Sequence, residues 1–232
     1  MSDTTAVNKA YFDKAAADYD GKFQDVFAKL EAELKARAHL LGADKRGRLL
    51  DYACGTGLIS QAIGNYFDQC VGIDLSDNMV EAYNAKAKSQ DLFPTRRQAH
   101  LGNLLNPADP NPAALSTPLF HDFDAAGVAV AFHHFDDCAL AARRLAERLR
   151  PNGLLFVVDF LPHGHMDRHD EAVRGVTHHG FDEARMRGLF EQAGVASHFS
   201  FDVVPGDVVF GNMGPGGCNV VRRLFFAIGR KA

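Results

Sequence analysis

Hydrophobic and polar positions follow two alternating patterns along most of the chain. Short, nearly continuous apolar runs are typical of strands that are buried on both faces of a sheet, and they predict strands at 49–53, 70–75, 96–101, 123–132 and 153–161. Apolar residues spaced three and four apart indicate amphipathic helices, here at 57–67, 76–89, 136–150 and 181–193. The second and third of these helices begin at good N-cap residues, Ser76 and Asp136. Strands and helices in alternation predict an α/β fold with a parallel sheet covered on both faces.

The two ends of the chain depart from this alternation. Residues 6–41 show a helical pattern with an interruption at Gly21, which predicts a helical cap over residues 1–42. Near the other end, the strand-like segments 195–204 and 220–228 flank a glycine-rich turn. Two strands joined by a turn predict an antiparallel pair at the edge of the sheet.

Two further segments, 103–122 and 162–180, are long, polar and irregular. Long loops inside a compact domain are often functional, so we expect both segments to form walls of a pocket, the second as a lid insertion. The chain shows no linker composition and no internal repeat. We therefore expect one domain over residues 1–232, with the cap at 1–42 and the core at 48–232.

Composition narrows the function classes. Hydrophobic residues make up 47% of the chain, charged residues 23%, and the formal net charge is −4. A nucleic-acid-binding surface is normally basic, and a membrane span needs a long apolar run that the sequence lacks. The four cysteines form no closely spaced pair, as is typical of reduced thiols inside cells. We therefore expect a cytoplasmic protein that binds neither nucleic acid nor membrane, and the sequence leaves its oligomeric state open.

The segment with the clearest chemistry is the glycine-rich turn that begins at Asp51 and ends at Gly57, between the first strand and the next helix. Glycines let the backbone turn tightly and let a ligand approach closely. Ligands of open α/β sheets bind outside the carboxyl ends of the strands, where this turn lies. Asp74 ends the second strand, and its carboxylate can accept hydrogen bonds from both ribose hydroxyls of an adenosine. The combination predicts a cofactor that contains adenosine.

Two residues bear on whether this cofactor is a dinucleotide. The dinucleotide pattern G-x-G-x-x-G needs a third glycine where this sequence has Ser60. Asp51, just before the turn, can meet an ammonium group directly or through water, whereas a diphosphate has little use for an acid there. These residues favour S-adenosylmethionine, which carries a cationic amino-acid end. An NAD(P)-dependent oxidoreductase is a less favoured alternative.

Several motifs follow one another in the order found in a known family. Residues 51–57, Asp-Tyr-Ala-Cys-Gly-Thr-Gly, resemble the first motif of the class I S-adenosylmethionine-dependent methyltransferases, and residues 71–79 resemble their ribose-binding motif. Three later segments are similar to the motifs of the third, fourth and fifth strands: 100–104, 123–135 and 149–155. The beginning of the chain is similar to the cap helix of members that act on small molecules, at 11–13 and 17–20.

The resemblance implies a Rossmann-like, doubly wound sheet of seven strands with the last strand antiparallel, and S-adenosylmethionine as the cofactor. It places residues from the matching motifs at the cofactor: Tyr19, Asp51, Ala53, Cys54, Gly55, Gly57, Asp74, Leu75, Met79, Gly102, Asn103, Leu104 and Ala129. The family usually has Asp where this chain has Asn103, whose side chain can still hydrogen-bond to the exocyclic amine of the adenine.

Methyl transfer needs an aligned nucleophile and, for a hydroxyl acceptor, a base that removes the proton. Residues 133–137 resemble the His-Asp-Trp-Ser-Asp segment of plant-type O-methyltransferases, in which His133 matches the catalytic histidine. We therefore expect His133 and His134 to be the candidate bases, and the alternative is a structural hydrogen bond at the edge of the cleft. The resemblance also places Tyr11, His178 and His179 near the acceptor.

The remaining motifs bear on the kind of substrate. The spacing of His163, His165 and His169 could suit a metal ion, but no carboxylate or cysteine is fixed nearby, so we expect no metal. Residues 132–135, Phe-His-His-Phe, stand where nucleic-acid and glutamine methylases carry an Asn/Asp-Pro-Pro-Tyr/Phe motif. The sequence therefore predicts methyl transfer to oxygen, nitrogen or sulfur of a small molecule. The alternative is a protein that binds S-adenosylmethionine without methyl transfer, such as an activator subunit or a pericyclase-like enzyme, because fold does not fix function.

Overall fold

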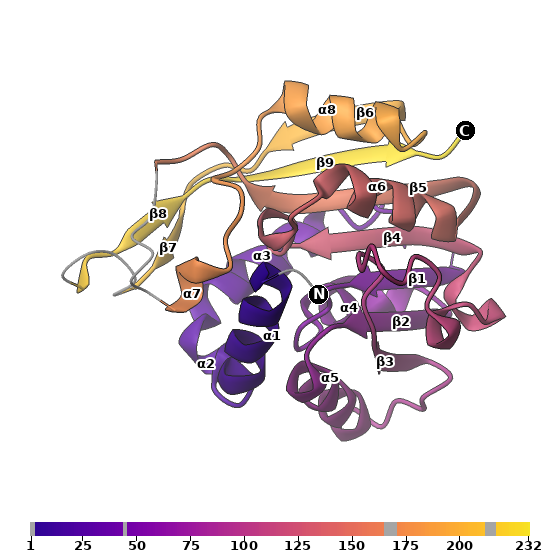
Figure 1. Ribbon diagram of the computed structural model, residues 1–232, viewed down its shortest axis with the longest axis horizontal. Helices are drawn as coiled ribbons and strands as arrows, with labels where there is room; N and C mark the ends of the chain where they lie inside the picture. The colour runs from indigo at the N-terminus through magenta and orange to yellow at the C-terminus, as the bar shows by residue number, and fades with distance from the viewer. Residues whose placement is uncertain (1–2, 44–45, 165–170, 212–216) are drawn as a thin grey trace.

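A mixed sheet of seven strands runs through the centre of the protein (Figure 1). The computed structural model describes residues 3–43, 46–164, 171–211 and 217–232. The strands, in the order of the sheet, are β3 (Arg97–Leu101), β2 (Gln69–Asp74), β1 (Arg48–Tyr52), β4 (Phe123–Ala129), β5 (Leu149–Phe160), β9 (Leu224–Arg230) and β6 (Ser197–Val203).

The order of the strands reverses at β1, which pairs in parallel with β2 on one side and with β4 on the other. The pairs β2–β3 and β4–β5 are also parallel, whereas β9 lies antiparallel between β5 and β6. Because the chain winds outward in both directions from β1, a crevice is left at the carboxyl ends of β1 and β4. The predicted α/β sheet of seven strands, with the last strand antiparallel, is confirmed.

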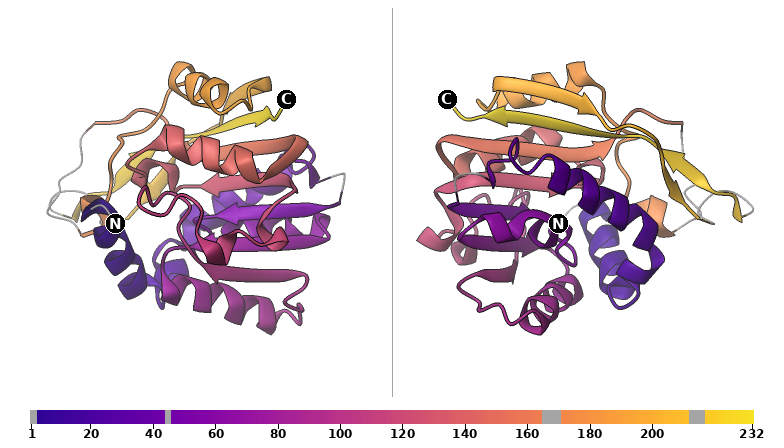
Figure 2. Two further views of the ribbon diagram at one scale, coloured as in Figure 1. Left: turned by 45° about the vertical axis from the view of Figure 1, so that its right-hand side comes forward. Right: turned by 180° about the vertical axis from the view of Figure 1, so that it is seen from behind.

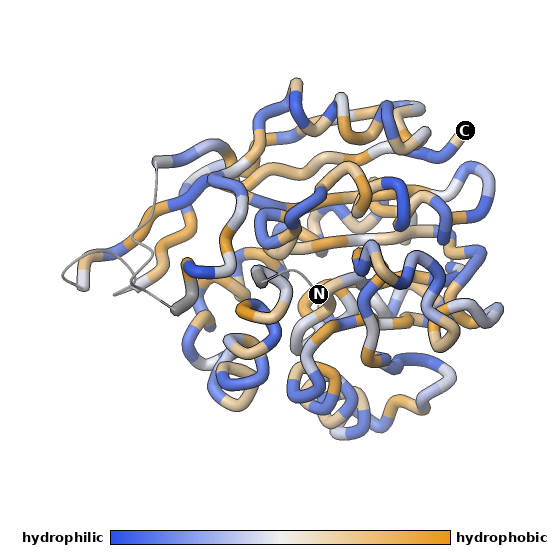
Figure 3. The backbone as a smooth tube through the Cα atoms, in the orientation of Figure 1, coloured by the Kyte–Doolittle hydropathy of each residue, from blue (hydrophilic) through white to orange (hydrophobic). Residues whose placement is uncertain are grey.

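Helices cover both faces of the sheet (Figure 2). Successive residues of a strand point to opposite faces, so Leu49 and Leu50 of β1 are buried in two different apolar clusters. Leu50 shares its cluster with residues of α6 (Cys138–Arg148) and α8 (Glu183–Gln192). Leu49 shares its cluster with residues of α3 (Gln24–Ala36) and α4 (Leu58–Ile63). The strands are accordingly apolar along much of their length (Figure 3).

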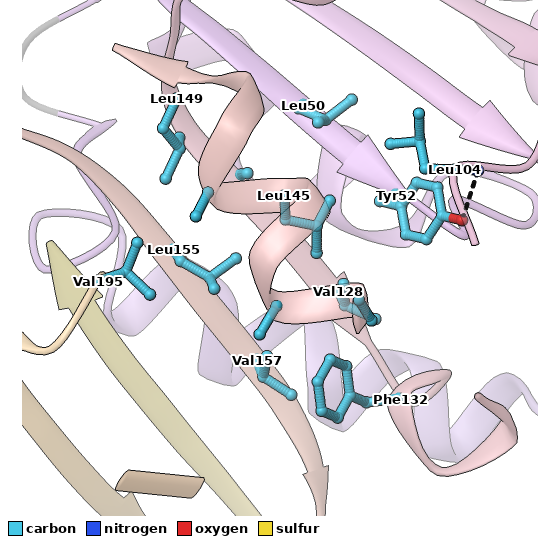
Figure 4. Packing of buried hydrophobic residues seen from close by; sticks show 14 of the residues in the cluster. Leu50, Tyr52, Leu104, Val128, Phe132, Leu145, Leu149, Leu155, Val157 and Val195 are labelled. Carbon is cyan, nitrogen blue, oxygen red and sulfur yellow. Dashed lines mark hydrogen bonds between the residues drawn. The ribbon is translucent and has the colours of Figure 1, made fainter. Parts of the chain in front are cut away.

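The packing under α6 illustrates how the strands and helices interlock. Leu145 of α6 lies among Leu50, Val128, Leu155 and Val157, which come from β1, β4 and β5 (Figure 4).

On the other side of the sheet, α5 (Asp77–Ser89) lies along β3. Short 3-10 turns complete the connections: η2 (Gly64–Tyr66), η3 (Ala113–Leu115) and η4 (Pro118–Phe120).

The predicted cap consists of three helices: α1 (Asp3–Ala15), α2 (Tyr19–Lys22) and α3. The interruption predicted at Gly21 is wrong, because Gly21 lies inside α2 and the chain breaks at 16–18 and at Phe23. The Phe23 ring is buried and packs against Phe27 and Phe210, which explains the position of the second break. α3 packs on α4 and fastens the cap to the core.

The fourth strand is shorter than predicted. β4 ends at Ala129 rather than at residue 132, because Val130 adopts a left-handed conformation (φ 52°). A 3-10 turn, η5 (Phe132–His134), follows. The two candidate histidines therefore lie on a tight turn beyond the end of the strand.

Helix caps were predicted at Ser76 and Asp136. The cap at Ser76 is confirmed, since Met79 N donates a hydrogen bond to Ser76 Oγ (3.1 Å). The cap at Asp136 is wrong by one residue, because Asp137 accepts the hydrogen bond from Leu140 N at the start of α6. The fifth strand also begins earlier than predicted, at Leu149.

Near the C-terminus, residues 220–228 form two strands where one was predicted. β8 (Val220–Arg222) pairs antiparallel with β7 (Val208–Phe210) in a separate two-stranded sheet, and β9 begins only at Leu224. The β7–β8 sheet extends beyond the seven-stranded sheet, near α7 (Glu171–Arg174) (Figure 1). The predicted antiparallel pair is confirmed for β6 and β9 and wrong for residues 220–222. Most of the glycine-rich turn before β8, residues 212–216, lies outside the described part of the chain.

Two other expectations concern the state of the cysteines and the lack of a membrane span. All four cysteines are free thiols, and Cys218 is the exposed one. Among the described residues, no helix has both the length and the apolar character needed to cross a membrane.

The packing of the cap generates the first prediction. Leu34 of α3 is fully buried in the cluster that joins α3, α4 and the sheet. Replacing it with alanine (Leu34→Ala) is expected to lower the free energy of unfolding by about 2–5 kcal/mol, measured by urea denaturation. Leu40 is 48% exposed, so Leu40→Ala is the matched control, with an expected change within about 0.5 kcal/mol. Equal losses in the two variants would contradict this packing.

Candidate active site

A cavity of about 310 Å³ lies at the carboxyl ends of β1, β2 and β4, in the crevice where the strand order reverses. Its wall comes from the turn after β1, from the ends of β2 and β3, and from the residues that follow β4. The cap adds Phe12 and Tyr19, and the loop predicted as a pocket wall adds Leu105, Asn106 and Pro107. We call this space the first cavity.

Most of the residues predicted for the cofactor line the first cavity: Tyr19, Ala53, Cys54, Gly55, Asp74, Leu75, Met79, Gly102, Asn103 and Ala129. Three others, Asp51, Gly57 and Leu104, lie behind its wall. Gly57 is left-handed (φ 99°), and a Cβ there would come within 2.8 Å of the Tyr83 ring. Leu104 is buried in the core. Gly57 and Leu104 therefore shape the wall from behind and do not form part of its surface.

Asp74 is fixed by the backbone around it. Its Oδ2 accepts a hydrogen bond from Gly55 N (2.8 Å), and its Oδ1 accepts one from Ser76 N (2.9 Å). Burial raises the pKa of Asp74, and these hydrogen bonds oppose that rise. Each oxygen keeps a further lone pair, so the carboxylate can accept two hydroxyl groups of a ligand in the cavity.

Gly55 and Asn103 determine what else a ligand would meet. Gly55 is left-handed (φ 50°), and a Cβ added there would have no protein atom within 4 Å, so a ligand can approach the backbone at this point. The side-chain oxygen of Asn103 accepts a hydrogen bond from Leu105 N (2.8 Å). Asn103 can therefore offer the N–H groups of its amide to a ligand, as a donor rather than an acceptor.

Asp51 is buried behind the wall of the first cavity. Its side chain is 1% exposed, and its Oδ2 accepts hydrogen bonds from Ser60 N (3.1 Å) and Ser60 Oγ (2.7 Å). Burial raises the pKa of Asp51 to about 7, against the effect of these two hydrogen bonds. The sequence left a direct and a water-mediated contact of Asp51 with the ligand open. Direct contact would require a side-chain rearrangement, so an interaction through space or through water fits this placement better.

A second, smaller cavity of about 90 Å³ adjoins the first. The two cavities share the lining residues Phe12, Tyr19, Val130 and His134. The second cavity lies between the cap, η5 and the β7–β8 sheet, and Tyr11 and His133 line it. A ligand in one cavity therefore lies next to a ligand in the other.

Aromatic side chains surround the second cavity in a closed belt. Each ring of the belt lies 4.3–6.0 Å from the next, measured between ring centroids. In order around the cavity, the members of this aromatic belt are His134, His133, Phe160, Phe210, Phe23, Tyr19 and Phe12. Such a wall accommodates an apolar or planar group.

His133 is paired with a buried carboxylate. Its Nδ1 lies 2.8 Å from Oδ1 of Asp159, which is fully buried at the end of β5. Asp159 also accepts hydrogen bonds from His133 N (3.1 Å) and Phe160 N (2.7 Å). Because the carboxylate accepts, the hydrogen bonds assign the ring hydrogen to Nδ1. His133 Nε2 then carries the lone pair that a base needs.

His134 differs from His133 in its hydrogen-bond partner, which is a backbone carbonyl and not a carboxylate. Its Nδ1 lies 3.0 Å from the carbonyl oxygen of Gly175, which can only accept, so Nδ1 carries the hydrogen. Burial, together with the neighbouring His133, lowers the pKa of His134 to about 3. A group with so low a pKa holds a proton poorly at neutral pH. His134 is therefore suited to accept a hydrogen bond, and His133 is the better candidate base.

His178 and His179 line neither cavity. The backbone N–H of His178 donates to His133 O (3.1 Å), and the His178 ring accepts a hydrogen bond from Arg185 of α8 (3.0 Å). The backbone bond holds η5, and the ring of His178 turns toward α8, so the expected place of these two histidines at the acceptor stays a prediction. The His179 ring packs against His163 (5.7 Å between centroids).

Asp159 and Asn8 are among the residues of the site that were missed in the sequence. Asp159 interrupts the apolar run of β5, and a charge in a buried strand signals a buried partner. Asn8 of α1 is buried and donates hydrogen bonds to Gly175 O (3.2 Å) and His134 O (3.3 Å). Nothing in the local pattern around Asn8 distinguishes it, because both partners are distant in the chain.

The structure offers no group of three or more His, Cys, Asp or Glu side chains that could hold a metal ion among the residues that it describes. Of the histidines considered for a metal, His165 and His169 lie outside those residues, and His163 lines the second cavity.

Known proteins that resemble this chain in sequence are methyltransferases. A family model described as "Methyltransferase domain" matches residues 24–198. An uncharacterized methyltransferase of Schizosaccharomyces pombe is 37% identical over 155 residues, which are 64% of this chain and 53% of that protein. The uncharacterized methyltransferase YcgJ of Bacillus subtilis is 30% identical over 113 residues, 48% of this chain and 40% of that protein. The aligned regions thus cover about half or less of these relatives.

A solved structure supports the fold. Magnesium protoporphyrin IX methyltransferase (ChlM) from Synechocystis PCC 6803, solved with bound S-adenosylmethionine, superposes with a TM-score of 0.65 and 15% identity, and the match covers 100% of this chain and 99% of that one. The chain belongs to the class I S-adenosylmethionine-dependent methyltransferase domain family.

Proposed function

We propose that this domain transfers a methyl group from S-adenosylmethionine to a nucleophilic oxygen, nitrogen or sulfur atom of a small molecule. The observation that carries the proposal is the pair of adjoining cavities, with Phe12, Tyr19, Val130 and His134 common to both. A donor in the first cavity and an acceptor in the second would meet at these shared residues. Placing two reactants side by side supplies much of the rate enhancement in such a displacement.

The residues of the first cavity fit the donor. Asp74 would accept the two ribose hydroxyls, because its oxygens are fixed by Gly55 N and Ser76 N and keep lone pairs on the cavity side. Asn103 would donate to a ring nitrogen of the adenine. The open space at Gly55 would let the donor lie against the backbone. The donor itself supplies a methyl group that its positive sulfur makes electrophilic.

The residues of the second cavity would prepare the acceptor. His133 Nε2 would take a proton from the nucleophile, and Asp159 would hold the ring in this tautomer and stabilise its protonated form. His134 would accept a hydrogen bond that orients the nucleophile. The aromatic belt would exclude water from the reacting atoms.

One alternative is a domain that binds S-adenosylmethionine and transfers no methyl group. A screen with isotopically labelled S-adenosylmethionine and a small-metabolite extract separates the two functions, with mass identification of the labelled product. We expect a labelled small molecule that disappears in His133→Ala. Binding of S-adenosylhomocysteine without any labelled product would favour the alternative.

The donor site generates a prediction for Asp74. Asp74→Asn removes the charge that would receive the ribose hydroxyls, and hydrogen bonds to charged groups contribute about 1.5–3 kcal/mol. We expect S-adenosylhomocysteine to bind roughly 10- to 100-fold more weakly, measured by calorimetry. Asp91→Asn, at an exposed position after α5, is the matched control and should bind normally. Unchanged affinity in Asp74→Asn would contradict the assignment of the ribose site.

Asp51 makes the affinity dependent on pH. Its pKa is raised to about 7 in the ligand-free protein, so the carboxyl group is largely protonated below that pH and ionised above it. The ammonium group of the ligand favours the ionised form. Affinity for S-adenosylhomocysteine should therefore rise between about pH 6 and pH 8, and Asp51→Asn should remove the rise. The same pH dependence in both proteins would show that Asp51 has no such role.

Asp159 generates a prediction about tautomers. Nitrogen chemical shifts of the His133 ring should show hydrogen on Nδ1 in the native protein and a mixture of tautomers in Asp159→Asn. Because part of the base is then in the wrong tautomer and its protonated form loses the carboxylate that stabilises it, kcat should fall by about 10²–10⁴, while KM for the acceptor and affinity for S-adenosylhomocysteine change little. Hydrogen on Nε2 in the native protein would contradict the proposed role of Asp159.

A further inference from the structure

Arg222 stands out among the residues that line the second cavity. Alternate residues of β8 face opposite sides, and Val221, between Val220 and Arg222, is 50% exposed. Val220 and Arg222 both line the cavity or its edge, and their partners on β7 are Phe210 and Val208. This inner face of the β7–β8 sheet is thus apolar except for one guanidinium group.

The guanidinium group has no carboxylate beside it in the described part of the structure. Its NH1 donates to the backbone oxygen of the neighbouring Val221 (2.8 Å), and no ion pair of Arg222 is found among the described residues. None of the described lining residues of the second cavity is acidic. Burial lowers the pKa of Arg222, because the charged group loses part of its hydration. A partly desolvated guanidinium with no carboxylate beside it attracts an anion.

Resting on the proposed function, we propose that the second cavity binds an acceptor with a small apolar body and one carboxylate, which Arg222 recognises. The aromatic belt would enclose the apolar body, and the guanidinium would pair with the carboxylate at the edge of the cavity. This assigns Arg222 as a residue that determines the class of acceptor.

The charges around the cavity decide between an anionic and a cationic acceptor. A cage of aromatic rings alone would also suit an ammonium group, through cation–π attraction. Arg222 opposes this, since like charges repel at the edge of the same space. His163 also lines the cavity, and burial first, then Arg222 and nearby histidines, lower its pKa, so it adds little charge at neutral pH. The cavity therefore favours an anion.

Size limits the acceptor further. The second cavity, at about 90 Å³, is well below the roughly 300–1,000 Å³ of sites for larger ligands. Its space suits a single ring or a short chain. Benzoate, benzyl alcohol and benzylamine share one ring and differ in charge, and they are suitable probes of the preference.

The test measures binding of these three probes to the protein saturated with S-adenosylhomocysteine, by ligand-observed NMR titration. We expect benzoate to bind at least about tenfold more tightly than benzyl alcohol, which corresponds to one charge-assisted hydrogen bond, and benzylamine to bind most weakly. Arg222→Gln should abolish the preference, and Arg222→Lys should keep part of it. Arg223→Gln makes the same change at the adjacent, exposed arginine and should leave the preference intact.

Several outcomes would overturn the inference: no binding of benzoate, equal or tighter binding of benzylamine, or a benzoate preference that survives in Arg222→Gln. These outcomes are distinct from failure of the proposed function, because the titration involves no methyl transfer. A labelled methylated product together with a preference for benzylamine would retain the function and reject the carboxylate. A benzoate preference that depends on Arg222, without any methylated product, would retain the site and reject the transfer.

Discussion

The reversal of strand order at β1 determines where a ligand can lie in this protein. β1 pairs with β2 on one side and β4 on the other, so the connections leave their carboxyl ends in opposite directions and open the first cavity. The turn after β1 can occupy this space only with left-handed residues, and Ala53, Gly55 and Gly57 all have positive φ. Asp74 then links the two strands, because it accepts a hydrogen bond from the turn itself.

The second cavity depends on contacts between segments that are far apart in the chain. The turn η5 holds His133 and His134, Asp159 anchors the first of them, and Gly175 accepts a hydrogen bond from the second. Asn8 ties the cap to the same place, and Gly175 allows this approach because a Cβ there would lie 1.6 Å from the Asn8 side chain. The cap, the core and the segment at Gly175 therefore meet at the two histidines. A change in the cap or in η5 would alter both cavities, because Phe12, Tyr19 and His134 line both.

This dependence on distant segments explains how much the sequence could predict. The sheet, its antiparallel last strand and most of the first cavity follow from short, contiguous motifs, in which neighbours in sequence are neighbours in space. The second cavity does not, because Asp159 and Arg222 gain their surroundings from distant segments, as does Asn8 at the wall of the first cavity. The end of β4 was also missed, since the apolar pattern continues to Phe132 although the left-handed Val130 ends the strand. Likewise, the apolar run 220–228 conceals a change of sheet between Arg222 and Leu224.

The proposed function requires donor and acceptor to occupy separate cavities that meet at shared residues. A crystal structure of the protein with S-adenosylhomocysteine tests this most directly. We predict that the ribose binds Asp74, and that the sulfur atom lies at the boundary formed by Val130 and His134, with the second cavity left open. A ligand whose amino-acid end fills the second cavity, or whose sulfur points away from His134, would contradict the account.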